Sequence, residues 1–167
     1  TYLNKDNINR QKGILQGKSC VIQPALSVGG WRTSAGSKAL DGYTALEDAT
    51  VVKRLRAAGA VIEGYSKMSE FGFGIKDDTT VAAMKQSRTT LALMNDMTGE
   101  ARIAAAQNGL YCFKPTAGVV SRYGLIGLMP SLESCAIIGR CLEDVRTGME
   151  VISGNDENDF SMEEGAL

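Results

Sequence analysis

Hydrophobic and polar positions along the chain follow one another in patterns that predict alternating helices and strands. The clearest unit covers residues 45–65, where apolar residues recur at helical spacing from Val51 to Ala58. Acidic residues precede this repeat, basic residues come later in it, and Gly59 stands where a helix C-cap belongs. We therefore expect a helix that ends near Ala58, followed by a buried strand over residues 60–65.

Shorter stretches continue the same alternation. Runs of β-branched and apolar residues predict strands, whereas alanine-rich or amphipathic stretches predict helices. The strands are expected at residues 20–26, 89–94 and 110–113, and the helices at 81–86, 98–109 and 142–154. This alternation favours the α/β fold class.

The composition is that of an ordinary folded domain and excludes several classes of protein. Of the 167 residues, 44% are apolar and 22% charged, which predicts a single folded domain rather than a disordered or fibrous chain. A formal net charge of −1 offers no basic face for nucleic acid. The longest apolar runs, residues 125–129 and 135–139, are far shorter than the about 20 residues of a membrane-spanning helix.

Cysteine and histidine usage narrows the possible chemistry further. The chain contains no histidine, which excludes Ser-His-Asp and Cys-His catalysis and histidine-ligated metal sites. The four cysteines form no C-x-x-C pair, so we expect buried thiols in a reducing compartment, at Cys20, Cys112, Cys135 and Cys141. Neither a metal nor a cofactor is expected.

Three stretches of the chain resemble the amidase signature family, in the family's own order. They are residues 43–74, with "DATVVKRLRAAGAVIEG", residues 113–134, with "KPTAGVVSRYGL", and residues 144–159, with "VISGNDEND". Several separate blocks carry the resemblance, so it does not depend on one short motif. Within the family, the A subunits of glutamyl-tRNA(Gln) amidotransferases are the most similar.

The resemblance implies a Ser-cisSer-Lys triad, and this chain departs from it. An ungapped match places Gln23 at the position of the family's lysine, and an amide side chain cannot take up a proton. Counting back from residues 114–116 places Glu100 at the nucleophilic serine, although Asp96 and Arg102 of the same motif are kept. Lys76 falls at the bridging serine, next to a deletion relative to the family, and no Gly-Gly-Ser-Ser run occurs.

These substitutions predict a pseudoenzyme without catalytic residues. Removing the nucleophile of a serine hydrolase alone lowers turnover by roughly 10⁶-fold. The implied fold is a truncated amidase-signature fold, a mixed twisted sheet flanked by helices (α/β/α). Its expected parts are an N-terminal extension at 1–14, the amidase-like domain at 15–159 and a polar tail at 160–167, which we expect at the surface or disordered.

The expected function follows from this departure. Strands missing from the family's sheet leave unpaired edges and bare apolar faces, which predicts protein partners in a larger complex rather than a small-molecule substrate, nucleic acid or a membrane span. By resemblance, a mitochondrial ribosome, respiratory or ATP-synthase complex is expected, with the cytoplasm as the other location. The alternative is a subunit or fragment of an amidase or glutamyl-tRNA(Gln) amidotransferase with residual or partner-supplied activity.

Several other residues have two interpretations. Asp96 and Glu100 are either an acid/base pair or, as we favour, partners of a helix N-terminus. Trp31 is either an interface anchor or a half-buried aromatic side chain. The lysines Lys67, Lys76 and Lys85 are expected to be solvated rather than relocated bases, and the methionines Met84, Met94, Met97 and Met129 are expected in the core.

Overall fold

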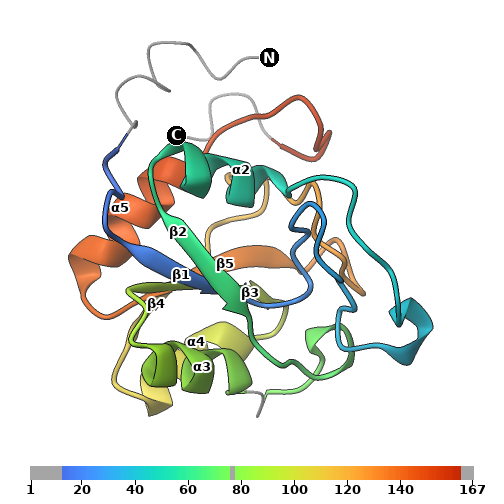
Figure 1. Ribbon diagram of the computed structural model, residues 1–167, viewed down its shortest axis with the longest axis horizontal. Coiled ribbons are helices and arrows are strands. Elements are labelled where there is room, and N and C mark those ends of the chain that lie inside the picture. The colour runs from blue at the N-terminus through green and yellow to red at the C-terminus, as the bar shows by residue number, and fades with distance from the viewer. Residues whose placement is uncertain (1–12, 76–77, 163–167) are drawn as a thin grey trace.

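A mixed five-stranded sheet forms the centre of the computed structural model, which describes residues 13–75 and 78–162 (Figure 1). The strand order is β2-β1-β3-β5-β4. The strands are β1 (Ser19–Ile22), β2 (Val61–Tyr65), β3 (Leu91–Asp96), β4 (Tyr111–Phe113) and β5 (Ser134–Gly139). The expected N-terminal extension and polar tail lie largely outside the described residues.

Strand directions follow from the connections between strands. β1 pairs in parallel with both β2 and β3. Helix α2 (Thr50–Ala57) lies between β1 and β2 along the chain, and α3 (Thr79–Ser87) lies between β2 and β3, as parallel crossovers require. β5 is antiparallel to both β3 and β4.

Helices cover both faces of the sheet, which makes three layers (Figure 1). Helices α2 and α5 (Leu142–Ile152) enclose one core with side chains such as Val51, Leu55 and Ile137. On the other face, α3 and α4 (Glu100–Gln107) enclose a smaller core that includes Met84 and Ala104. The prediction of a mixed sheet flanked by helices is therefore confirmed.

Most predicted elements occur near their expected positions, with two differences in the sheet. α2 ends at Ala57, and Gly59 follows with φ +92°, as the predicted cap requires. The strand over residues 60–65, expected to be buried, is the edge strand β2 with two exposed residues. The sequence prediction missed β5, whose six residues are all buried because it lies between β3 and β4.

The burial predicted for two cysteines and one methionine was wrong. Cys141 is exposed and Cys112 only partly buried, whereas Cys20 and Cys135 lie in the core. Met129 is 38% exposed because it lies in the loop before β5, while Met84, Met94 and Met97 are buried as predicted. Within residues 13–75 and 78–162, no helix has the length and hydropathy needed to cross a membrane.

Trp31 is half-buried. Its ring packs against the larger core and meets the ring of Tyr65 edge-on, with the ring centroids 5.1 Å apart. The intramolecular contact favours the second interpretation of this residue, a half-buried aromatic side chain.

Candidate functional site

The residues at the positions implied for the triad lie beyond the carboxyl ends of the central parallel strands. In open α/β sheets this is where ligands bind. Gln23 directly follows β1, and Glu100 begins α4 four residues after β3 ends at Asp96. Both side chains are buried. Lys76, at the third position, lies outside the described residues.

Gln23 joins the ends of β1 and β3. Its backbone N–H donates to the carbonyl of Leu93 at 3.0 Å, and its side-chain Oε1 accepts from the backbone N–H of Asn95 at 2.9 Å. Gly72 approaches the same amide closely, since a Cβ at Gly72 would lie 3.8 Å from Nε2. The neutral amide side chain therefore links the ends of β1 and β3, and it offers no group that accepts a proton.

Glu100 fills an anion site that its own turn creates. The backbone N–H groups of Met97, Thr98 and Gly99 all donate to its Oε2, at 3.0, 2.8 and 3.1 Å. The Thr98 hydroxyl donates to Oε1 at 2.8 Å. Successive backbone N–H groups that converge in this way form a nest for a negative charge. We call these three N–H groups the 97–99 nest.

The hydrogen bonds to Glu100 also set its protonation. Burial disfavours the carboxylate, but hydrogen bonds from the backbone N–H groups of Glu100 itself, Thr98 and Met97 and from the Thr98 hydroxyl together favour it more strongly. The pKa of Glu100 is therefore lower than its ordinary value. At neutral pH a full negative charge occupies the nest.

Asp96 has a separate set of donors. Arg102 binds it with Nε and Nη2, both at 3.0 Å, and donates its backbone N–H at 3.2 Å. This two-pronged ion pair fixes the first turn of α4 to the end of β3. Asp96 and Glu100 thus have separate sets of donors at the start of α4, which favours their interpretation as partners of the helix N-terminus.

The described residues place no other base or metal site near Gln23 and Glu100. Lys67 and Lys85 are exposed, as expected, and Lys85 Nζ donates to Asn108 Oδ1 at 3.2 Å. Across the described part of the chain, no cluster of histidine, cysteine, aspartate or glutamate could hold a metal ion.

A buried pair of hydroxyl groups was missed by the sequence prediction. The side-chain oxygens of Ser66 and Thr80 lie 2.8 Å apart, and both residues are buried. Ser66 follows β2 and Thr80 belongs to α3, so the two residues come from different elements. No local sequence signal could have brought them together.

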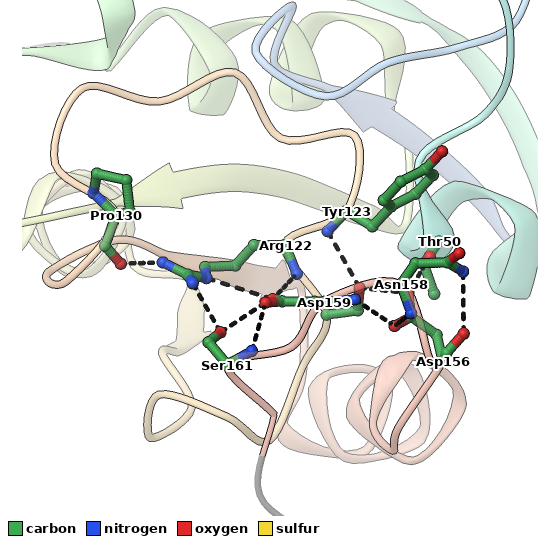
Figure 2. Close-up of polar contacts among 9 residues, drawn as sticks. Thr50, Arg122, Tyr123, Pro130, Asp156, Asn158, Asp159 and Ser161 are labelled. Atoms are coloured by element: carbon green, nitrogen blue, oxygen red, sulfur yellow. Dashed lines mark hydrogen bonds and ion pairs between the residues drawn. The ribbon is translucent and has the colours of Figure 1, made fainter.

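A second group of polar residues surrounds the loop that contains Arg122 (Figure 2). The backbone N–H of Arg122 donates to Asp159 Oδ2 at 2.8 Å, and its Nε lies 3.3 Å from the same oxygen. Its guanidinium also donates to the carbonyl of Pro130 and, at 2.6 Å, to the Ser161 hydroxyl. The loop is thereby fixed to the segment that follows α5.

Asp156 ties three parts of the fold together beside this loop (Figure 2). The hydroxyls of Thr50 in α2 and Ser121 in the loop both donate to its Oδ2. The N–H groups of Asn158 and Asp159 donate to Oδ1 at 3.0 and 3.1 Å. Burial opposes ionisation of Asp156, but these bonds outweigh it and lower its pKa.

These contacts explain the role of the second group. A cavity of about 390 Å³ opens between Arg122, Tyr123, Pro130 and Asp159. Its main cation and anion, Arg122 and Asp159, already bind each other, so we interpret the group as a scaffold. Of the polar tail at 160–167, expected at the surface or disordered, the described residues 160–162 lie at the surface, where the Ser161 hydroxyl accepts from Arg122.

Comparison with known proteins gives a consistent match over nearly the whole chain. The family model described as "Amidase" matches residues 2–89 and 79–165. The A subunit of the glutamyl-tRNA(Gln) amidotransferase from Haloarcula marismortui is 36% identical over 174 residues, which cover 91% of this chain and 41% of that protein. The corresponding A subunit from Thermotoga maritima is 32% identical over 178 residues, covering 93% of this chain and 38% of that protein.

Solved structures agree with the fold. The crystal structure of the Thermotoga maritima protein has a TM-score of 0.80 and 32% identity, covering 90% of this chain and 38% of that one. A structure described as an unexpected vestigial protein complex, which reveals the evolutionary origins of an s-triazine catabolic enzyme, has a TM-score of 0.85 and 25% identity. It covers 95% of this chain and 41% of that chain. The chain thus spans about two fifths of the relatives that it matches.

Proposed function

The chain belongs to the amidase family, and from this membership we propose that it is a catalytically inactive member that serves as a structural or accessory subunit of a larger protein assembly. The observation that carries the proposal is the carboxylate of Glu100 in the 97–99 nest. Acyl transfer from an amide develops a negative oxygen that needs free N–H donors. In this chain, three backbone N–H groups lie in the turn where the resemblance implies the nucleophilic serine. All three already donate to the carboxylate of Glu100.

The residues at two of the implied triad positions also support inactivity. Gln23 stands where the resemblance implies a lysine base, and its buried amide is used to join β1 and β3. Glu100 itself replaces the implied nucleophile, and a carboxylate held by four hydrogen bonds is poorly suited to attack an amide carbon. The implied base and the implied nucleophile are therefore both replaced by residues with structural contacts.

The assembly role has separate support. One structure with this fold is described as a vestigial protein complex. A mitochondrial complex as the assembly, and mitochondria as the location, stay predictions from the resemblance.

Inactivity is tested with the purified 167-residue chain. We expect no labelling by a serine-directed fluorophosphonate and no release of ammonia from glutamine or asparagine above a buffer blank. The variants Ser66→Ala and Ser121→Ala serve as controls, since each removes a buried serine hydroxyl. Labelling or ammonia release that disappears in one of these variants would contradict inactivity.

The assembly role is tested in the cells that produce the protein. Cross-linking followed by affinity purification is expected to recover the chain with stable protein neighbours, in a species much larger than 17.8 kDa on a native gel. Migration of all the protein at the size of the free chain would contradict an accessory role.

The second candidate function is a component of an amidotransferase whose partner supplies the chemistry. It is favoured by the curated relatives, several of which are A subunits of glutamyl-tRNA(Gln) amidotransferases at 32–36% identity. The recovered assembly separates the two candidates. Ammonia release from glutamine by the assembly, lost when this chain is omitted, would establish the second and overturn the first.

A further inference from the structure

Glu133 is a buried acidic residue whose two carboxylate oxygens are used unequally. It is 3% exposed and directly precedes β5. Its Oε1 accepts from the backbone N–H groups of Leu128 and Met129 at 2.5 and 3.1 Å. Within residues 13–75 and 78–162, no hydrogen bond and no ion pair reaches its Oε2. Burial of a charge without such partners is costly, so the free oxygen needs an explanation.

The free oxygen lies at the wall of the cavity beside the Arg122 loop. Glu133 and Gly127 both line this cavity of about 390 Å³, which we call the Glu133 cavity. A Cβ at Gly127 would lie only 1.7 Å from Oε2, so the carboxylate occupies the space that a side chain would need. Glycine at position 127 therefore makes room for the carboxylate. Gln23 and Glu100 lie outside the lining, so this is not the place of the implied triad.

The charges around the Glu133 cavity leave Glu133 without a counter-ion. The charged residues of the described lining are Arg122, Glu133 and Asp159. Arg122 Nε pairs with Asp159 Oδ2 at 3.3 Å, so the charges of these two residues cancel (Figure 2). The negative charge of Glu133 remains, and it favours a cation in the cavity.

The oxygen that is already used determines which kind of cation fits. A guanidinium binds a carboxylate best through two parallel N–H bonds, one to each oxygen. Oε1 of Glu133 already accepts two N–H groups, so such a fork would have to displace them. An ammonium group needs only one oxygen and brings three donors. Asn158, in the same lining, donates Nδ2 to the Asp156 carbonyl at 2.9 Å, and its Oδ1 can accept a second ammonium N–H.

We propose that the Glu133 cavity binds a primary ammonium group, held by Glu133 Oε2 and Asn158 Oδ1. Leu125 and Pro130 line the same cavity and supply apolar surface for the alkyl chain that carries the ammonium. A free alkylamine and the lysine side chain of another protein share this chemistry. The inference goes beyond the proposed function and does not rest on it, because binding at this cavity needs neither catalysis nor an assembly.

The test is an NMR titration of the isotope-labelled 167-residue chain with n-butylammonium chloride at constant ionic strength. The backbone N–H groups of Leu128 and Met129 donate to the same carboxylate, so their signals report on binding. We expect both signals to shift saturably. Tetramethylammonium carries the charge without an N–H donor, and methylguanidinium carries its donors in a planar fork. Each of these two cations should bind at least about tenfold more weakly than n-butylammonium.

Two variants and a matched control locate the site. Glu133→Gln keeps an acceptor for the two loop N–H groups but removes the charge and replaces Oε2 by a donor, so n-butylammonium should bind at least about tenfold more weakly. Gly127→Ala keeps the charge but places a methyl group where Oε2 lies, and it should also weaken binding. Glu63→Gln removes a charge at an exposed position of β2 and should bind like the unmodified chain. Because Glu133→Gln conserves shape, the test stays valid if Gly127→Ala does not fold.

Each outcome decides the proposal. Saturable binding that Glu133→Gln weakens and Glu63→Gln does not supports it. The absence of a saturable shift would mean that Oε2 binds water alone and would overturn the proposal, as would equal binding by Glu133→Gln or equal binding of either other cation.

A capped glycine pentapeptide with one central lysine then identifies the source of the ammonium group. Binding at least as tight as that of n-butylammonium indicates a lysine of another protein, and weaker binding indicates a free amine. Inactivity and assembly are measured in separate experiments, so a failed titration leaves the proposed function intact.

Discussion

Glu100 shows how a single residue determines both stability and chemistry at the carboxyl end of the sheet. Its carboxylate accepts from three backbone N–H groups, two of which belong to the buried residues Met97 and Gly99 and would otherwise lack a partner. A neutral amide accepts such bonds less strongly than a carboxylate does. The charge at residue 100 is therefore part of what holds the first turn of α4 in place.

The first prediction concerns Glu100→Gln. We expect the variant to unfold with a free energy lower by about 1–3 kcal/mol near neutral pH, because bonds to a charged acceptor are replaced by weaker ones. Urea denaturation measures this difference. Glu63→Gln, at an exposed position of β2, is the control and should change stability by less than about 0.5 kcal/mol.

The pH dependence follows from the lowered pKa of Glu100. A carboxylate with a lower pKa in the folded state adds stability above its ordinary pKa, near 4.5, and loses that contribution as the pH falls through the folded-state value. The difference between the unmodified chain and Glu100→Gln should therefore shrink between about pH 7 and about pH 3. A difference that stays constant over this range would show that the charge is not responsible.

The thiols provide a second prediction at the residue scale. Burial raises the pKa of the Cys112 and Cys135 thiols to about 12 and also raises that of Cys20, whereas Cys141 is exposed. Because the thiolate is the reactive form, only Cys141 should react rapidly with Ellman's reagent in the folded protein. Cys141→Ser should abolish the rapid reaction and leave three thiols that react after unfolding in urea.

At the scale of elements, Arg54 holds α2 to the segment after α5. Its guanidinium is buried and donates to the carbonyls of Ile152, Gly154 and Asn155 at 2.7, 2.8 and 2.9 Å. Arg54→Ala leaves these carbonyls without a donor and should lower the free energy of unfolding by about 3 kcal/mol. Arg56→Ala, in the same helix but paired at the surface with Asp48, should cost at most about 1 kcal/mol.

Gly124 fixes the approach of its loop to the start of α2. Its φ is +83°, and a Cβ there would lie 2.6 Å from the Cα of Ala49. Gly42 has a similar φ of +85° but open space around it. Gly42→Ala should therefore cost about 1 kcal/mol for backbone strain alone, and Gly124→Ala about 2 kcal/mol more for the steric clash. Thermal unfolding of the two variants measures the difference, and equal costs would exclude the clash.

Local pattern identified most elements because their signals lie within the elements themselves. The apolar spacing of residues 51–58 and Gly59 located α2 and its end to within about one residue. β5 was missed because residues 134–139 are buried on both faces, so no polar alternation marks them as a strand. The exposure of β2 depends on the strand order, which periodicity does not contain.

The residue types at the site could be predicted from the sequence, but the geometry of the site could not. The resemblance identified Gln23 and Glu100 as departures from the triad, and their residue types are what led us to propose inactivity. The converging N–H groups of the 97–99 nest depend on the backbone conformation of one turn, and no sequence pattern records it. The contacts of Asp156 with Ser121 and of Asp159 with Arg122 join residues 35 and 37 positions apart, so local composition could not predict them.

At the scale of the whole molecule, stability should be highest at the centre of the sheet. β3 and β5 are buried at every residue and pair with each other over six residues, whereas β2 and β4 lie at the edges. Native-state hydrogen exchange should therefore show the slowest amides in β3 and β5 and earlier exchange in β4.

The hydrogen bonds of Arg54 to the segment after α5 also affect how the protein folds during its synthesis. Its three acceptors lie about 100 residues later in the chain, so during vectorial synthesis the guanidinium has no permanent partners until the ribosome has released residue 155. Until then, α2 lacks the three hydrogen bonds of Arg54, and the charged guanidinium of this residue stays without its carbonyl partners. A nascent chain stalled before that point should be open to proteases and chaperones around α2, and one stalled well beyond it should be protected.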